Sequence, residues 1–149
     1  MSEKNPLRMI DVSKKDIVHR EAEAEGRIYL KMDTIKAIIE GRIKKGDPLA
    51  AAEISCILAV KKTPELIPLC HPIPLTSIDV NFDFKESSLR IWCRVTADYK
   101  TGVEMEALTG VTTGLLTLWD MVKYLEKDER GQYPSTSISE VRVIEKRKE

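Results

Sequence analysis

Aromatic residues, histidines and paired cysteines are scarce in this chain of 149 residues. Cys56, Cys70 and Cys93 form no CxxC pair, which argues against a disulfide framework and a structural zinc site and predicts a reducing, cytoplasmic compartment. The longest apolar-like run is only Ile54–Val60, and Met1–Arg20 lacks the apolar core of a signal peptide. We therefore expect no membrane association.

Net charge of one sign is also missing, because 24 Lys and Arg balance 24 Asp and Glu. No long-range field attracts the chain to nucleic acid, so any anion site has to be a local cluster of cations. The length fits one domain with its own core. We expect a flexible arm over residues 1–16 and a single folded domain over residues 17–146.

Hydrophobic periodicity predicts the order strand, helix pair, strand, strand, helix, strand. The expected elements are a strand over 27–32, a helix capped by Asp33 and ended by Gly41, a helix from Pro48 to about Lys62 capped by Asp47, an ordered loop over 64–74, a hairpin of 77–84 and 89–95, a long helix over 104–127, and a C-terminal strand around Val141 and Val143. This order predicts an α+β ferredoxin-like sandwich, an antiparallel sheet with helices on one face. The second helix is apolar nearly all round, which predicts that it is buried.

The other face of such a sheet is uncovered. Bulky residues such as Trp92 near that face predict self-association, so we expect an oligomer.

The long helix carries a polar stripe at helical spacing, formed by Glu106, Gly110, Thr113, Thr117 and Asp120. The small residues either admit a ligand or only permit close packing of another backbone. The two carboxylates are more informative, because a carboxylate beside a packed surface needs a partner.

Several side chains in the sequence suit proton transfer. Asp120 and Lys123 share a helix face, where the carboxylate can orient the ammonium or take its proton. Lys45 follows Lys44, and a cationic neighbour lowers the proton affinity of a lysine, which makes its neutral, basic form more accessible. His71 lies in a proline-rich loop and is suited to bind phosphate or relay protons. The alternatives are a solvated ion pair, a solvated turn and a structural histidine.

Four blocks of the chain resemble, in order and approximate spacing, the MoaC family of cyclic pyranopterin monophosphate synthases. They are Lys45–Asp47, Leu66–Pro72, Lys100–Thr109 and Asp120–Lys123. The resemblance covers roughly Met9–Lys146. The family often has a Gly- and Lys-rich tail after the last strand, whereas this chain ends with residues 145–149. Lys146 is the candidate to replace a tail lysine at the substrate phosphates.

The resemblance implies a lyase of molybdenum cofactor biosynthesis. It would convert a cyclised dihydroguanosine triphosphate, 3',8-cyclo-7,8-dihydro-GTP, to cyclic pyranopterin monophosphate and release pyrophosphate. It implies a homohexamer built as a trimer of dimers, with sites at subunit interfaces. No cofactor is required, and magnesium bound with the pyrophosphate stays open. The implied catalytic residues are Lys45, Asp120 and Lys123, and the implied substrate-binding residues are Arg20, Leu69, Cys70, His71, Glu104, Met105 and Glu106.

Two other classes of function remain as alternatives. Ferredoxin-like folds also serve as non-enzymatic nucleotide- or RNA-binding modules, although Phe82 and Phe84 lie on the apolar side of their strand and the chain has no net positive charge. A cysteine hydrolase would use Cys70 with His71. Adjacent residues in an extended loop usually point apart, which makes this pair a poor nucleophile and base.

Overall fold

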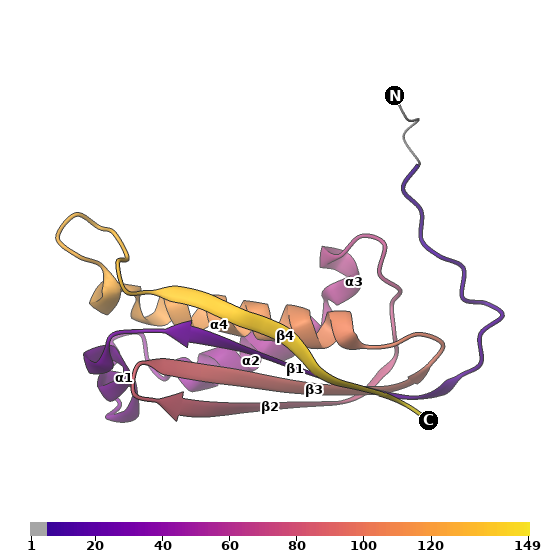
Figure 1. Ribbon diagram of the computed structural model, residues 1–149, viewed down its shortest axis with the longest axis horizontal. Coiled ribbons are helices and arrows are strands. Elements are labelled where there is room, and N and C mark those ends of the chain that lie inside the picture. The colour runs from indigo at the N-terminus through magenta and orange to yellow at the C-terminus, as the bar shows by residue number, and fades with distance from the viewer. Residues whose placement is uncertain (1–5) are drawn as a thin grey trace.

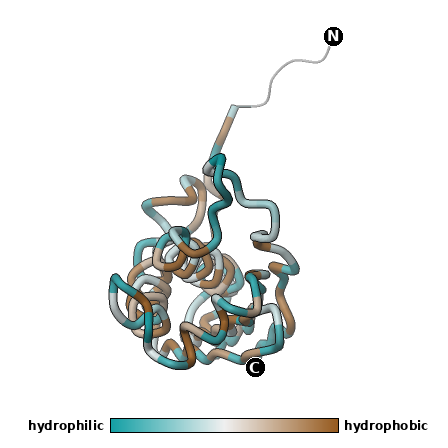
Figure 2. The backbone as a smooth tube through the Cα atoms, turned by 90° about the vertical axis from the view of Figure 1, so that its left-hand side faces the viewer, coloured by the Kyte–Doolittle hydropathy of each residue, from teal (hydrophilic) through white to brown (hydrophobic). Residues whose placement is uncertain are grey.

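The computed structural model describes residues 6–149 and shows an antiparallel sheet with helices on one face (Figure 1). The elements are β1 (Val18–Tyr29), α1 (Met32–Ile39), α2 (Pro48–Lys61), α3 (Thr63–Leu66), β2 (Leu75–Lys85), β3 (Ser88–Tyr99), α4 (Glu104–Glu126) and β4 (Ser137–Lys148). The strand order is β2-β3-β1-β4, and every neighbouring pair is antiparallel. Seen end on in Figure 2, the helical coils gather on one side of the sheet. The α+β ferredoxin-like prediction is confirmed.

Strand β1 is longer than predicted and differently placed. It begins at Val18 and ends at Tyr29, whereas the sequence pattern suggested a strand over residues 27–32. Its inward positions are mostly alanines and Gly26, so the strand alternates with period two but carries little apolar signal. Arg20, at its start, is also on the inward side and is 5% exposed.

The predicted cap of α2 is confirmed, and the cap of α1 is wrong. Asp47 accepts a hydrogen bond from the backbone N–H of Leu49 at 2.9 Å, directly before Pro48. Helix α1 instead begins after Lys31, whose N–H is bound by the carboxylate of Glu126 at 3.1 Å. Tertiary contact with the end of α4 therefore replaces the local cap expected from Asp33.

Helix α2 is half buried rather than buried all round. Its inward side packs on α4, but Ile54 and Leu58 are 60% and 51% exposed. The expected loop over residues 64–74 is also partly wrong, because Thr63–Leu66 forms the short helix α3. Pro64 stands in its first turn, where the missing N–H costs nothing.

The hairpin, α4 and the C-terminal strand agree with prediction. Gly110 and Gly114 let α4 approach its neighbours closely. A Cβ at Gly110 would lie 2.6 Å from a methyl group of Val60, and one at Gly114 would lie 2.5 Å from a methyl group of Ile91. These two positions therefore serve packing, one of the two alternatives that the stripe left open.

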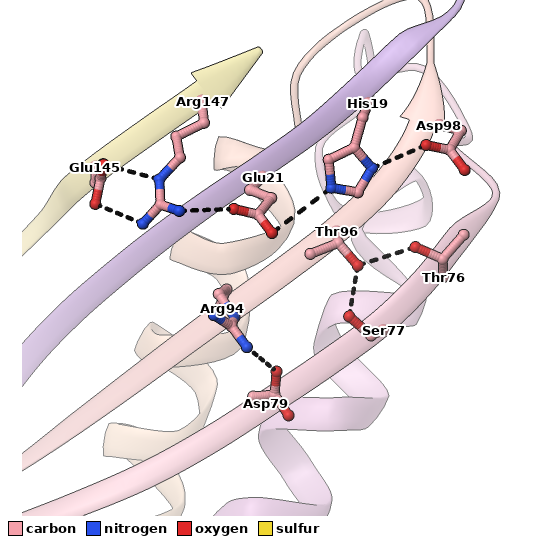
Figure 3. A network of polar contacts seen from close by, with 10 residues as sticks. All are labelled: His19, Glu21, Thr76, Ser77, Asp79, Arg94, Thr96, Asp98, Glu145 and Arg147. Carbon is pink, nitrogen blue, oxygen red and sulfur yellow. Dashed lines mark hydrogen bonds and ion pairs between the residues drawn. The ribbon is translucent and has the colours of Figure 1, made fainter. Parts of the chain in front are cut away.

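The open face of the sheet carries a network of polar contacts (Figure 3). Arg147 bridges Glu145 and Glu21, and His19 contacts Glu21 and Asp98 at 3.6 and 2.9 Å. These carboxylates raise the pKa of His19, the Asp98 hydrogen bond most of all. The face near these residues is thus polar and largely paired within the chain.

Candidate active site

One group of predicted site residues meets near the C-terminal end of α4. We call Lys45, Asp120 and Lys123 the lysine–aspartate set. The Lys45 ammonium donates to the Asp120 carboxylate at 3.1 Å and to the Asp120 backbone carbonyl at 3.0 Å. The Lys123 ammonium lies 3.3 Å from the other carboxylate oxygen. One carboxylate is therefore held between two ammonium groups.

Local structure explains how this set assembles. Asp120 and Lys123 are three residues apart on α4 and so share a face. Lys45 comes from the connection between α1 and α2, where Gly46 has a φ of 116°, a left-handed value that favours glycine. This turn directs the Lys45 side chain across to α4.

The lysine–aspartate set is exposed to solvent, and its two ammonium groups stabilise the ionised form of the carboxylate. The Asp120 side chain is 59% exposed. The hydrogen bond from Lys45, and after it that from Lys123, hold the pKa of Asp120 below its ordinary value. Asp120 is thus ionised at neutral pH and is available to accept or relay a proton.

A cavity of about 390 Å³ adjoins the lysine–aspartate set. Trp119 and Tyr133 form part of its wall, with their rings in edge contact at a centroid distance of 5.1 Å. Leu116 and Ile138 complete the apolar side, while Asp120 and Lys123 supply the charged side. A flat apolar surface beside paired charges suits a heterocycle that carries an anionic group.

A second group of predicted residues lies at the N-terminal end of α4. We call Cys70, His71, Glu104 and Glu106 the carboxylate–loop set. Glu106 is 1% exposed, and one of its oxygens is 3.7 Å from the Cys70 sulfur. Its other oxygen is buried and, within residues 6–149, has no hydrogen-bond partner. Burial raises the pKa of Glu106.

The Cys70 thiol is poorly suited to nucleophilic attack. Burial and the neighbouring Glu106 raise its pKa to about 11, so the reactive thiolate is rare at neutral pH. The His71 ring contacts the backbone carbonyl of Ile10 through Nε2 at 2.6 Å, while the Cys70 sulfur contacts the His71 backbone carbonyl and the Glu106 carboxylate rather than the imidazole. This arrangement opposes the cysteine hydrolase alternative.

Glu104 also has an unsatisfied oxygen. One carboxylate oxygen lies 3.2 Å from the Lys146 ammonium, and the other is buried without a partner in the described part of the chain. Lys146 reaches this end of α4 because it is paired with Ala22 in the sheet and so shares its inward face. A Cβ at Gly102 would lie 2.9 Å from the Lys146 side chain, so this glycine makes room for the pair.

The remaining predicted residues lie near the carboxylate–loop set. The guanidinium of Arg20 donates to the carbonyls of Lys100 and Tyr99 at 3.1 and 3.4 Å, so part of its donor capacity holds the backbone. Leu69 and Met105 are 40% and 37% exposed.

The two sets do not meet within one chain. Glu106 and Asp120 are fourteen residues apart on one helix, which corresponds to about 21 Å at 1.5 Å per residue. The single chain therefore separates the residues that were expected to share one pocket.

Sequence reasoning missed Tyr124, whose hydroxyl and ring contact Lys44. Nothing in the sequence pattern distinguishes Tyr124 from an ordinary surface tyrosine at the end of a helix. For Lys146 the sequence offered only its position in the tail, and its pairing with Glu104 depends on the register of the sheet.

Residues 6–149 contain neither a metal-binding cluster nor a membrane-spanning helix. In this range no three His, Cys, Asp or Glu side chains cluster as a metal ion would require. No helix in the same range combines the length and apolar character needed to cross a membrane.

Comparison with known proteins agrees with the geometry. The family model described as the MoaC family matches residues 9–149. The chain is 63% identical over 140 residues to a probable cyclic pyranopterin monophosphate synthase of Pyrococcus abyssi, covering 94% of this chain and 88% of the relative. It is 62% identical to a protein of the same name from Pyrococcus furiosus, covering 96% and 92%. A relative from Methanothermobacter thermautotrophicus, 56% identical and covering 95% and 89%, is named a probable cyclic pyranopterin monophosphate synthase accessory protein. The chain belongs to the MoaC family.

Proposed function

We propose that this chain is a cyclic pyranopterin monophosphate synthase of molybdenum cofactor biosynthesis. Its reaction converts 3',8-cyclo-7,8-dihydro-GTP to cyclic pyranopterin monophosphate with release of pyrophosphate. The observation that carries the proposal is the lysine–aspartate set, present in a chain 63% identical to a relative of that name.

The lysine–aspartate set is suited to the proton transfers of this reaction. Ring opening, pterin-ring closure and attack of a sugar hydroxyl on phosphorus each move protons, and grouped amines and carboxylates can exchange them. The pKa of Asp120 is held low, so its carboxylate stays ionised and its candidate role is to orient the two ammonium groups and relay protons between them. Lys45 and Lys123 are candidate acids, and their charge also favours the departing pyrophosphate.

The carboxylate–loop set supplies substrate contacts in this proposal. Glu104 and Glu106 each offer a buried oxygen that has no partner among residues 6–149, which is suited to accept hydrogen bonds from the amino and ring N–H groups of a guanine-derived heterocycle. The other proposed contacts are Arg20, Leu69, Cys70, His71 and Met105.

A second copy of the chain would bring the two sets together. An outward stripe on α4 runs through Met105, Thr112, Leu116 and Asp120, and its middle is uncharged. Met105 and Leu116 are 37% and 57% exposed, so the stripe offers apolar surface that a second copy could cover. Site residues lie at both ends of this stripe.

Antiparallel packing of two such stripes has a simple geometry. A two-fold axis between Thr112 and Thr113 sets residue i opposite residue 225 minus i, so that Asp120 of one copy faces the exposed Met105 of the other, next to Glu104 and Glu106. Each dimer then has two equivalent sites, each with the lysine–aspartate set of one copy and the carboxylate–loop set of its partner. A homohexamer of three such dimers and a cytoplasmic location complete the proposal. No redox cofactor takes part, and any magnesium arrives with the phosphates.

Incubation of the purified chain with 3',8-cyclo-7,8-dihydro-GTP tests the function. The expected result is pyrophosphate release together with a product that oxidises to a fluorescent pterin, in the presence and absence of EDTA. The Asp120→Asn variant serves as the inactive control. No product from a folded wild-type chain would overturn the proposal and would favour an accessory role that needs another protein.

A further inference from the structure

Two adjacent lysines lie at the candidate site, and only the second of them contacts the Asp120 carboxylate. Lys44 and Lys45 both extend from the segment of residues 40–47 between α1 and α2, which we call the lysine loop. Only Lys45 contacts Asp120, at 3.1 Å from the carboxylate and 3.0 Å from the backbone carbonyl. A change of one residue in the register of this loop would bring Lys44 to the carboxylate instead.

The lysine loop has the backbone freedom for such a change. Gly41 and Gly46 lie near its ends with φ values of 70° and 116°. Inside it, the N–H of Gly46 donates to the carbonyl of Ile43 at 3.1 Å, a short-range contact that does not tie the loop to α4. Ile43, directly before Lys44, is 7% exposed and packs in the core, so it anchors the first half of the loop, and the contact made by Lys44 then decides how the second half meets α4.

Tyr124 makes that connection. Its hydroxyl accepts a hydrogen bond from the backbone N–H of Lys44 at 2.9 Å. Its ring also lies beneath the Lys44 ammonium, 5.2 Å from the ring centroid, in a cation–π contact. Tyr124 stands one helical turn after Asp120, so the same face of α4 holds both the carboxylate and the contact that places the loop.

We propose that Tyr124 is a positioning residue that fixes the register of the lysine loop and so selects Lys45, rather than Lys44, as the partner of Asp120. The hydroxyl places the backbone one residue before Lys45. The ring keeps the Lys44 ammonium away from Asp120. The catalytic consequence rests on the proposed function, whereas the selection itself does not.

Competitive acetylation of lysines tests the selection without any substrate. The intact chain is labelled with trace acetic anhydride, cleaved after glutamate, and the labelling of Lys44 and Lys45 is resolved by fragment-ion mass spectrometry. In the wild type, Lys45 is expected to react more slowly than exposed Lys85, because its ammonium donates two hydrogen bonds. In Tyr124→Phe, which keeps the ring and loses the hydroxyl, Lys45 labelling should rise roughly three- to tenfold, the range expected from one lost neutral hydrogen bond. Tyr124→Leu should raise it further.

Two controls separate positioning from general loosening. Tyr29→Phe removes another tyrosine hydroxyl, one that bonds Glu140 on the open face of the sheet, and should leave Lys45 labelling unchanged. Lys31, whose ammonium donates to the carbonyl of Leu125 at 3.1 Å, reports on loosening at the end of α4 within each variant.

A rise specific to Lys45 supports the selection. Unchanged Lys45 labelling in both Tyr124 variants, or an equal rise at Lys31, overturns it. Turnover is then measured separately, and kcat should fall about three- to tenfold in Tyr124→Phe with little change in KM. Altered labelling with unchanged kcat would leave the selection standing and would instead count against a catalytic role for Lys45.

Discussion

The two ends of α4 carry site residues in opposite physical states. At the C-terminal end, Asp120 is exposed, ionised and held by Lys45 and Lys123 from the same chain. At the N-terminal end, Glu104 and Glu106 each have a buried oxygen that finds no partner within residues 6–149. Burial raises the pKa of Glu106, whereas ion pairing lowers that of Asp120.

At the C-terminal end of α4 the carboxylate already has its partners, and we call this the complete end. At the N-terminal end two buried oxygens have no partner within residues 6–149, and we call this the incomplete end. The lysine–aspartate set pairs its one carboxylate with two ammonium groups, so the carboxylate is satisfied within the chain. The carboxylate–loop set includes buried acceptors that are costly until a donor arrives. A ligand or a second copy that supplies N–H groups would remove that cost, which is why the incomplete end is better suited to binding than to proton transfer.

Substitutions at the complete end should have the largest effect. Asp120→Asn and Lys123→Met are each expected to lower kcat by about a hundred- to ten-thousandfold, the usual contribution of a proton-transfer group, while the oligomer stays intact. Steady-state kinetics with size-exclusion chromatography checks this. Asp83→Asn, which changes an exposed carboxylate on strand β2, is the matched control. Wild-type rates in either set variant would remove the catalytic role of the set.

Mixing variants from the two ends tests whether they belong to one composite site. Lys123→Met is combined, after dissociation and reassembly, with a Glu104→Gln/Glu106→Gln double variant. Half of the dimers in an equal mixture are hybrids with one intact site of two, so about a quarter of the wild-type activity should return. Mixing Lys45→Met with Lys123→Met should restore nothing, because both lysines contact the same Asp120. No recovery in the first mixture, together with recovery in the Lys45→Met and Lys123→Met mixture, would contradict the antiparallel α4 arrangement.

The same comparison explains what the sequence could reveal. The spacing of Asp120 and Lys123 on one helix predicts their contact, and the alternation in β2 and β3 predicts the hairpin, because these patterns are local. The cap of α1 was missed because Glu126 lies 95 residues from Lys31 in the chain. The Lys146 contact with Glu104 depends on strand register, which the sequence does not reveal. Lys45 was assigned through the family resemblance, since no local pattern brings its loop to α4.

The buried carboxylate at the incomplete end predicts a pH-dependent stability. The folded-state pKa of Glu106 is raised, so its neutral form is favoured on folding. That contribution is fully present below the ordinary pKa of 4.5 and is lost as pH rises through the raised value. Glu106→Gln should therefore melt at a temperature a few degrees higher, relative to the wild type, at pH 8 than at pH 4. If calorimetry gives the same difference in melting temperature between variant and wild type at both pH values, burial does not raise the pKa of Glu106.

Cys70 should show the smallest effect on turnover, although it lies at the same end as Glu106. Cys70→Ala is expected to change kcat/KM by less than about tenfold, because it removes one weak thiol hydrogen bond and no nucleophile. Alkylation of the wild-type thiol by iodoacetamide should be slow at pH 8 and accelerate toward pH 11, following the raised pKa of about 11. Fast alkylation at neutral pH together with an inactive Cys70→Ala variant would restore the nucleophile hypothesis. Slow alkylation with an active variant would place Cys70 among the groups that only shape the binding end of the site.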